Sequence, residues 1–402
     1  MSDVIREILQ TTAFRKLDVE HLLDSSCPSW VRFDTELGYV PNSIVMRDGI
    51  DDSFSTYTYQ PTGERKMINY VDMPCRISTY GNSFTQCQQV SDDETWQERL
   101  AAHFGEPIRN FGSGGYGVYQ AYRRALRVEQ GALSVANIIL NIFSDDHIRN
   151  LDAARWIRTA WYEKDWPKER AHQLHGLPWA HVRYDLEKND FVEKPGLCSS
   201  QEELLALCDP EYFYEVFRDD QIVRLFAHEV GGEADCEDLQ ELAERFGLKV
   251  NLKDPSTRRE DAYRLHNEYG LRSTMFILDK MRQWCRQNSK RLFVILSYGT
   301  YSVPGMTGLV DYLSRQIRWD LSLIEYLRQH DVPYVDLLDK HMEDFRQHNL
   351  SVEEYLAKYF VRPAEAAVFG HYNPLGNLFT AFAAKEALVS WLEPKPPAYR
   401  KT

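Results

Sequence analysis

The chain has 402 residues, of which 43% are hydrophobic and 27% charged, a composition typical of a globular protein with a large core. Asp and Glu (60) outnumber Lys and Arg (47), so the formal net charge is −13, and this acidity disfavours nucleic-acid binding. The seven cysteines form no CxxC pair and no window approaches 18 apolar residues, which argues against a disulfide framework, a structural zinc site and a membrane span.

The first residues also lack the basic segment and apolar stretch of a secretory signal. Together with the cysteine pattern, this predicts a cytoplasmic protein. No feature of the sequence calls for a cofactor, and the oligomeric state is left open.

The predicted elements fall into three segments. Residues 1–70 are predicted to form an N-terminal appendage, with a short strand at residues 56–60. Residues 71–402 then alternate between strands and helices. Strands are predicted at 76–80, 107–111, 135–143, 292–298 and 333–337, and helices at 94–104, 118–130, 259–287, 313–324 and 374–392. Asn373 is the predicted N-cap of the last helix.

Residues from about 150 to 256 interrupt this alternation. The stretch is rich in tryptophan, tyrosine and charged residues, and it is too long for a bare loop in a compact domain. It is predicted to be an inserted lid or subdomain, with helices at residues 202–207 and 236–246.

Alternating strands and helices predict a parallel sheet that is covered on both faces. The predicted fold is a three-layer α/β/α sandwich with a flavodoxin-like sheet, carrying the appendage and the insertion. Ligands of such sheets bind at the carboxyl ends of the strands, so the functional site is expected there.

Three segments carry candidate chemistry, and the first is the string TYGNSFT at residues 79–85. It places Ser83 at a glycine-marked turn directly after a predicted strand. A serine hydroxyl becomes a useful nucleophile only when it is exposed at such a position beside a base. Taken alone, the string favours the alternative of a turn serine that caps the next segment.

The second segment is the glycine-rich string NFGSGGYG at residues 110–117. Glycines allow backbone N–H groups to approach a developing oxyanion closely. The alternatives are an ordinary flexible turn and a phosphate-binding turn before a helix. The string does not fit G-x-x-x-x-G-K-[ST], and its match to G-x-G-x-x-G spacing is weak evidence for a nucleotide.

The third segment is GHYNP at residues 370–374, in which His371 directly precedes the last predicted helix. Catalytic residues are often held on such loops. The chain has 12 histidines, so only its neighbours single out His371 as a candidate base.

Together, these three segments resemble the SGNH/GDSL hydrolase superfamily, in the branch with a GDSF-like nucleophile block, an NFGxGGYG-like block and a late H-x-N-P-x-G block. The resemblance covers residues 76–150 and 291–392, and residues 33–41 resemble the segment that often precedes the first block. It implies that Ser83 is the nucleophile and that its N–H forms part of an oxyanion hole. It further implies that Gly115 donates a second N–H and that His371 is the general base.

The sequence departs from the family pattern at three places. Asn82 stands where the family has Asp, a change expected to affect the turn more than the chemistry. Asp145 falls where the family places an oxyanion-binding Asn; an ionised carboxylate cannot donate, whereas a protonated one can. The positions where the family has an acid before the histidine hold Phe369 and Val368. In a Ser–His dyad, a backbone carbonyl could orient the imidazole in place of that acid. Glu365 is near the histidine in sequence but not at the expected position.

Other residues of these segments complete the predicted site. The pocket is predicted to involve Asn82, Tyr116, Asp146, His147 and Asn373. No metal site is predicted, because three consecutive residues such as Asp145, Asp146 and His147 rarely converge on one ion, and a solvated loop is favoured. Cys87 is expected to be a small core residue rather than a rival nucleophile.

The predicted function is a serine hydrolase that cleaves an ester of a small molecule or carbohydrate, with an O-acetyl or other short acyl group. An acyltransferase that uses the same acyl-enzyme is the first alternative. A non-catalytic carbohydrate- or lipid-binding relative is the second, suggested by Asp145 and the missing acid. Nucleotide binding at residues 112–117 is the third.

Overall fold

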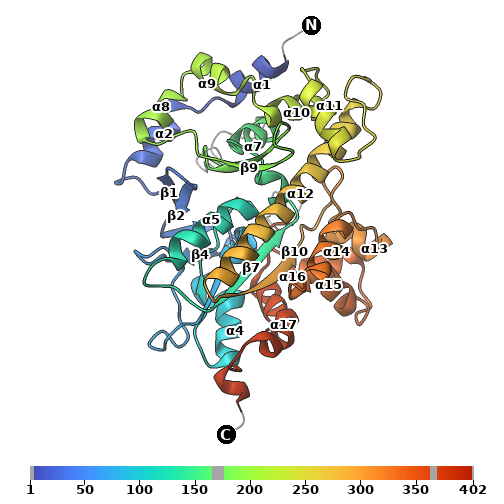
Figure 1. Ribbon diagram of the computed structural model, residues 1–402. Coiled ribbons are helices and arrows are strands. Elements are labelled where there is room, and N and C mark those ends of the chain that lie inside the picture. Colours follow the sequence, from blue (N-terminus) through green and yellow to red (C-terminus); the bar gives the residue numbers. More distant parts are fainter. Residues whose placement is uncertain (1–3, 165–175, 363–368, 401–402) are drawn as a thin grey trace. The chain divides into compact units, whose positions relative to one another are not determined.

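A computed structural model describes residues 4–164, 176–362 and 369–400 (Figure 1). Packing divides the chain into two compact units, one made of residues 1–40 and 147–276 and the other of residues 41–146 and 277–402. The sequence-based division had a boundary near residue 70 and an insertion at about 150–256. In the structure, residues 41–70 pack with the unit that contains the main sheet, whereas residues 1–40 pack with the insertion.

The first unit is mainly helical. Its elements are α1 (Val4–Thr12), α2 (Lys16–Leu23), β1 (Val31–Asp34), β2 (Gly38–Pro41), α7 (Trp156–Glu163), β8 (His181–Asp185), β9 (Asp190–Lys194), α8 (Gln201–Ala206), α9 (Pro210–Phe217), α10 (Gln221–Glu229) and α11 (Glu237–Arg245). Helix α1 packs against α7 and α9, and Phe14 stacks on Trp156 with ring centroids 5.8 Å apart. The predicted helices at 202–207 and 236–246 correspond to α8 and α11.

The second unit contains the sheet and the three sequence segments. Its elements are β3 (Ile44–Arg47), η1 (Ile50–Asp52), β4 (Phe54–Tyr57), β5 (Ile77–Tyr80), α3 (Ser83–Gln86), η2 (Asp92–Glu94), α4 (Trp96–Phe104), β6 (Arg109–Asn110), α5 (Val118–Glu129), β7 (Asn137–Phe143), β10 (Arg291–Ser297), α13 (Leu309–Arg315), α14 (Leu321–Gln329), β11 (Tyr334–Asp336), α15 (Leu337–Phe345), α16 (Val352–Tyr359), α17 (Pro374–Trp391) and η4 (Pro397–Tyr399). Two helices, α6 (Asp146–Arg149) and α12 (Arg258–Gln287), run from one unit into the other.

The main sheet has five parallel strands in the order β11-β10-β7-β5-β6. Counted along the chain within the sheet, this is the order 2-1-3-4-5 of flavodoxin-like folds. The predicted parallel sheet is therefore confirmed. Its strand order reverses between β5 and β7, and open sheets of this kind place ligands beyond the carboxyl ends of the strands at that reversal.

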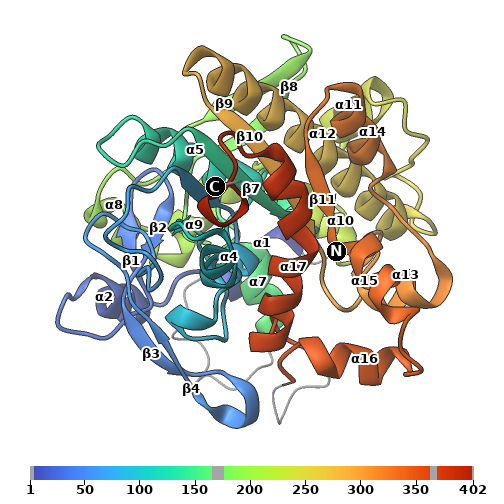
Figure 2. The ribbon, with the colours of Figure 1, turned by 90° about the horizontal axis from the view of Figure 1, so that it is seen from below.

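Helices cover both faces of this sheet. Thr79, Ile139 and Phe293 are neighbours in register on three adjacent strands, so their side chains lie on the same face. Thr79 Oγ1 accepts a hydrogen bond from Gln97 of α4 at 3.1 Å. The ring of Phe293 lies 5.3 Å from that of Trp391 of α17, measured between centroids. Helices α4 and α17 therefore share one face, where they pack together (Figure 2). Tyr80 points to the other face, because side chains alternate along a strand, and its hydroxyl donates to Glu129 of α5 at 2.8 Å. The result is the expected three-layer sandwich.

The predicted helix at residues 313–324 is wrong. The chain forms two helices there, α13 and α14, separated by a linker. Gln316 ends α13 in the left-handed conformation (φ 54°), and Asp320 in the linker is buried. Its carboxylate accepts hydrogen bonds from Arg318 and Tyr298, at 2.7 and 2.8 Å, so a buried polar network holds the interruption in place.

The predicted N-cap of the last helix is confirmed, since Asn373 Oδ1 accepts from the Gly376 N–H at 2.9 Å. Among the residues that the structure describes, no helix is both long enough and apolar enough to cross a membrane.

Candidate active site

Ser83 is the first residue of α3 and lies just beyond the carboxyl end of β5. The turn between them requires Gly81, which has φ +152°; a Cβ there would overlap the Thr85 hydroxyl and the Asn141 carbonyl oxygen. Ser83 keeps 7% of its surface exposed. The chain thus reverses sharply from strand to helix and presents a serine at the point where the strand order reverses.

Asn82 ties this turn to the end of the neighbouring strand. Its Oδ1 accepts from the Phe84 N–H at 2.8 Å and caps α3, while its Nδ2 donates to Asp146 Oδ2 at 2.5 Å. The same carboxylate oxygen accepts from the Phe143 N–H at 2.9 Å, and Asp146 is only 1% exposed. The carboxyl ends of β5 and β7 are therefore joined through Asp146, with half-buried Asp145 beside it.

The glycine-rich loop packs directly on α3. A Cβ at Gly112 would overlap the backbone of Thr85 and Gln86. The Gly114 N–H donates to Gln86 Oε1 at 2.6 Å, and the Ser113 N–H donates to the Gly81 carbonyl at 3.1 Å. Backbone contact this close explains why position 112 requires a glycine.

Two N–H groups of these segments are candidates for binding an oxyanion. Within the described ranges, neither the Ser83 N–H nor the Gly115 N–H donates a hydrogen bond, and Gly115 adopts φ +81°. An oxyanion hole requires donors that are held in place and not already bonded. The family resemblance implies the same two N–H groups as oxyanion donors.

Tertiary packing places His371 against Phe84, the residue that follows Ser83. The centroid of its imidazole lies 5.1 Å from that of Phe84. Phe84 stacks on Phe143 at 4.7 Å and meets the edge of Tyr372 at 5.3 Å. The nucleophile block, the end of β7 and the late histidine block thus meet around one aromatic ring.

Gln89, which the sequence analysis did not single out, makes two polar contacts with His371. Gln89 Oε1 accepts from the His371 backbone N–H at 2.6 Å and lies 3.3 Å from the ring Nδ1. Gln86 was missed as well. The only sequence signal was the string QCQQ at residues 86–89, three glutamines directly after the nucleophile block, and this pattern also suits an exposed loop.

Buried Arg65 holds the turn that connects α3 to Gln89. Its guanidinium donates to the carbonyl oxygens of Gln86, Cys87 and Val90 at 2.5, 3.0 and 2.6 Å, and it pairs with Asp92 at 2.8 Å. Arg65 is 1% exposed. One side chain therefore satisfies three carbonyl groups that the irregular turn leaves without backbone partners.

The remaining predicted residues have structural contacts. Tyr116 is fully buried, and Asn373 caps α17 while also donating to the Lys358 carbonyl at 3.0 Å. His147 is buried within the first unit, where its Nδ1 lies 2.8 Å from Thr274 Oγ1. Burial raises the pKa of the Cys87 thiol to about 12, so this cysteine is no thiolate nucleophile at neutral pH. Val368, at a position where the family has its acid, and Glu365, the nearby carboxylate, lie outside the described residues.

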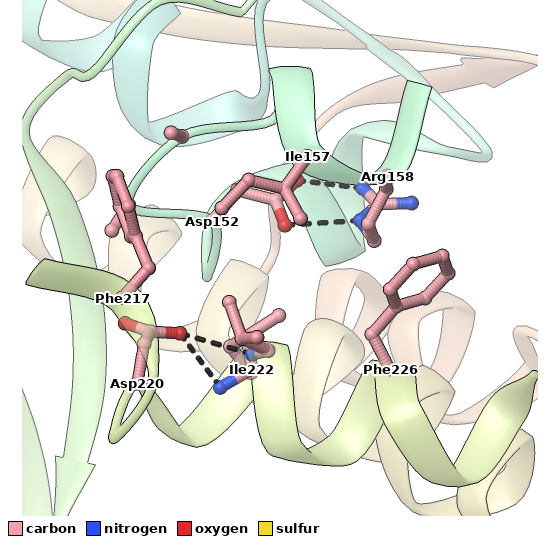
Figure 3. A pocket seen from close by; sticks show the side chains of 10 residues that line it. Asp152, Ile157, Arg158, Phe217, Asp220, Ile222 and Phe226 are labelled. Atoms are coloured by element: carbon pink, nitrogen blue, oxygen red, sulfur yellow. Dashed lines mark hydrogen bonds and ion pairs between the residues drawn. The ribbon is translucent and has the colours of Figure 1, made fainter. Parts of the chain in front are cut away.

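No predicted site residue lines the cavity shown in Figure 3, which lies within the first unit. Its volume is about 10 Å³, room for about one water molecule. Asp152 and Arg158, two of its lining residues, form a bidentate pair at 3.0 and 2.6 Å. Within the described residues, no three His, Cys, Asp or Glu side chains form a group that could hold a metal ion.

The fold and the site together define a doubly wound α/β protein with a serine at the reversal of its strand order. No protein-family model matches the chain, and no curated protein matches its sequence. Among solved structures, the chain is similar to a Bacteroides fragilis protein described as a candidate acylhydrolase. The TM-score is 0.33 and the identity 12%, over 81% of this chain and 92% of the other. Similarity at this level does not decide what the chain does.

Proposed function

We propose that the chain is a serine hydrolase that cleaves an ester, with Ser83 as nucleophile and His371 as general base. The observation that supports this most is the meeting of three distant segments at the carboxyl ends of β5 and β7. A serine at a strand-to-helix turn, two unbonded N–H groups and an imidazole beside Phe84 are the parts that acyl transfer to a serine requires.

In the proposed reaction, His371 Nε2 takes the proton of Ser83 as Oγ attacks the acyl carbon. The N–H groups of Ser83 and Gly115 stabilise the oxyanion of the tetrahedral intermediate. The C–O bond to the alcohol then breaks, and the proton on Nε2 goes to the departing oxygen. Water attacks the resulting acyl-enzyme in the reverse sequence of proton transfers, which releases the acid and restores Ser83.

A short acyl group, such as O-acetyl on a small molecule or carbohydrate, is the proposed substrate class. Ser83 is only 7% exposed and lies next to Phe84, which is packed between Phe143 and Tyr372. Such close packing favours a small acyl group over a long chain. The proposed oxyanion site also includes Asp145, which precedes Asp146 and falls where the family has an asparagine amide.

Labelling with a fluorophosphonate probe, followed by peptide mapping, tests this proposal. The wild type should be labelled at Ser83, the Ser83→Ala variant should not be labelled there, and the His371→Ala variant should be labelled far more slowly. A labelled wild type is then assayed on a panel of short-chain and O-acetyl esters. A folded wild type that remains unlabelled between pH 5 and 8 would overturn the proposal.

A further inference from the structure

The histidine block of this chain has no carboxylate at the two positions where an orienting acid was sought, Phe369 and Val368. A catalytic histidine nevertheless needs a partner for Nδ1, because that partner determines which ring nitrogen carries the proton. The structure provides an acceptor from another part of the chain, since Gln89 Oε1 lies 3.3 Å from His371 Nδ1. We infer that Gln89 is the positioning residue of His371.

Two hydrogen bonds determine which end of the Gln89 amide faces the histidine. Gln89 Nε2 donates to the carbonyl oxygen of Asp48 at 2.9 Å, and Oε1 accepts from the His371 backbone N–H at 2.6 Å. In the flipped orientation, two donors would face each other at His371 and two acceptors at Asp48. The oxygen of the amide must therefore point to His371.

The backbone around this amide is held equally firmly. Gln89 adopts φ +72°, and its N–H donates to the Tyr57 hydroxyl at 2.6 Å. That hydroxyl donates in turn to Asp48 at 2.7 Å. On the histidine side, Gly370 leaves the space that the amide occupies, because a Cβ there would overlap Gln89 Oε1.

An acceptor at Nδ1 requires that the neutral imidazole carry its proton there. The lone pair of Nε2 is then available to accept the Ser83 proton, and the resulting imidazolium keeps its Nδ1–H bonded to the amide oxygen. A neutral amide performs the orienting part of the role that a carboxylate has in Ser-His-Asp triads. This inference rests on the proposed function for its catalytic meaning, whereas the proton position is a property of the fold.

The test combines ¹⁵N NMR of the His371 side chain with fluorophosphonate labelling of Ser83. Three proteins are compared: the wild type, Gln89→Met, which keeps the length of the side chain but has no amide, and the matched control Gln88→Ala. Gln88 is the adjacent glutamine, and its side chain makes no hydrogen bond within the described part of the chain. A His371→Ala spectrum assigns the signals.

The wild type and Gln88→Ala should show the Nδ1–H tautomer at neutral pH. Gln89→Met should lose that preference and label about 10- to 100-fold more slowly, the usual cost of removing a residue that orients a reactive group. A wild type with the proton on Nε2, or a Gln89→Met variant with an unchanged tautomer and labelling rate, would overturn the inference. The expected tautomer pattern without labelling of Ser83 would instead support the positioning and reject the hydrolase.

Discussion

The side-chain amide of Asn82 donates to a carboxylate oxygen of Asp146 across 2.5 Å, at a position where both residues are buried. Asn82 precedes the proposed nucleophile, and Asp146 follows β7. This bond joins the ends of the two strands between which the strand order reverses. The bond therefore adds a side-chain link beyond Tyr80 and Leu140, the last paired residues of the two strands.

Replacing Asn82 by Asp should destabilise the second unit. The variant keeps the helix cap but places two carboxylates in contact, which raises the pKa of the pair in the folded state. The folded state then holds an extra proton, so the loss is small near pH 4 and complete at pH 7.5. The expected loss there is about 3 kcal/mol in the free energy of unfolding, measured by urea denaturation.

The double variant Asn82→Asp/Asp146→Asn restores one donor and one acceptor. It should recover much of the stability lost at pH 7.5, giving a clear coupling energy in a double-mutant cycle. Additive losses in the cycle would show that Asn82 and Asp146 do not stabilise each other.

Gly112→Ala should displace the glycine-rich loop from α3, because its Cβ would overlap the backbone of Gln86. We expect a loss of stability of about 1–3 kcal/mol, as for overpacked sites, and a marked fall in the labelling of Ser83. The control is Gly131→Ala, where the nearest atom would lie at an ordinary 3.4 Å. Equal melting temperatures and labelling rates for the two variants would contradict the close packing.

Arg65→Met should be among the most damaging substitutions in the second unit. It removes the donors of three carbonyl groups and leaves Asp92 without its buried partner. We expect a loss of about 3–5 kcal/mol in urea unfolding. The matched control is Arg47→Met, whose side chain is 67% exposed and should contribute little. Similar losses for both variants would show that Arg65 does not hold the turn after α3.

His341 should make the second unit sensitive to acid. It is fully buried between the hydroxyls of Tyr355 and Tyr372, at 3.0 and 2.7 Å, and burial lowers its pKa to about 3 from an ordinary 6.5. The unfolded chain binds a proton below pH 6.5 and the folded chain does not, so stability is lost as the pH falls from 6.5 toward 3.

The expected contribution of His341 is about 1.4 kcal/mol per pH unit within that window. His341→Gln should be less stable at pH 7 and should show a shallower fall between pH 6 and 4.5. His330→Gln, at an exposed position, is the control variant. A slope that is the same in all three proteins would show that His341 does not titrate with unfolding.

Asp145→Asn should raise the activity at neutral pH, if the proposed oxyanion site is correct. An amide can donate to the oxyanion, whereas an ionised carboxylate repels it, and one added donor is worth up to about 100-fold in rate. The rate is measured from pH 5 to 8 by ester hydrolysis or by labelling of Ser83. A variant that is slower at every pH would show that the carboxyl group has a separate role.

Much of the fold could be predicted because local patterns and sheet geometry agree. The apolar runs that became β7 and β10 are bounded and rich in β-branched residues, so both strands were expected close to their observed ends. The helix predicted across residues 313–324 failed for a physical reason. Its apolar spacing continues through Gln316, whereas a left-handed residue and the buried Asp320 network break the helix, and spacing does not reveal either.

The sequence alone determined the parallel α/β sheet, the serine turn after its first strand, the glycine-rich loop and the cap of the last helix. All of these were predicted from patterns among residues close together in the chain. Only the tertiary structure decided that residues 1–40 pack with the insertion, that Arg65 holds the turn after α3, and that Gln89 bonds to His371. These contacts join segments that are far apart in sequence, and a buried polar group takes whichever partner the fold brings within reach.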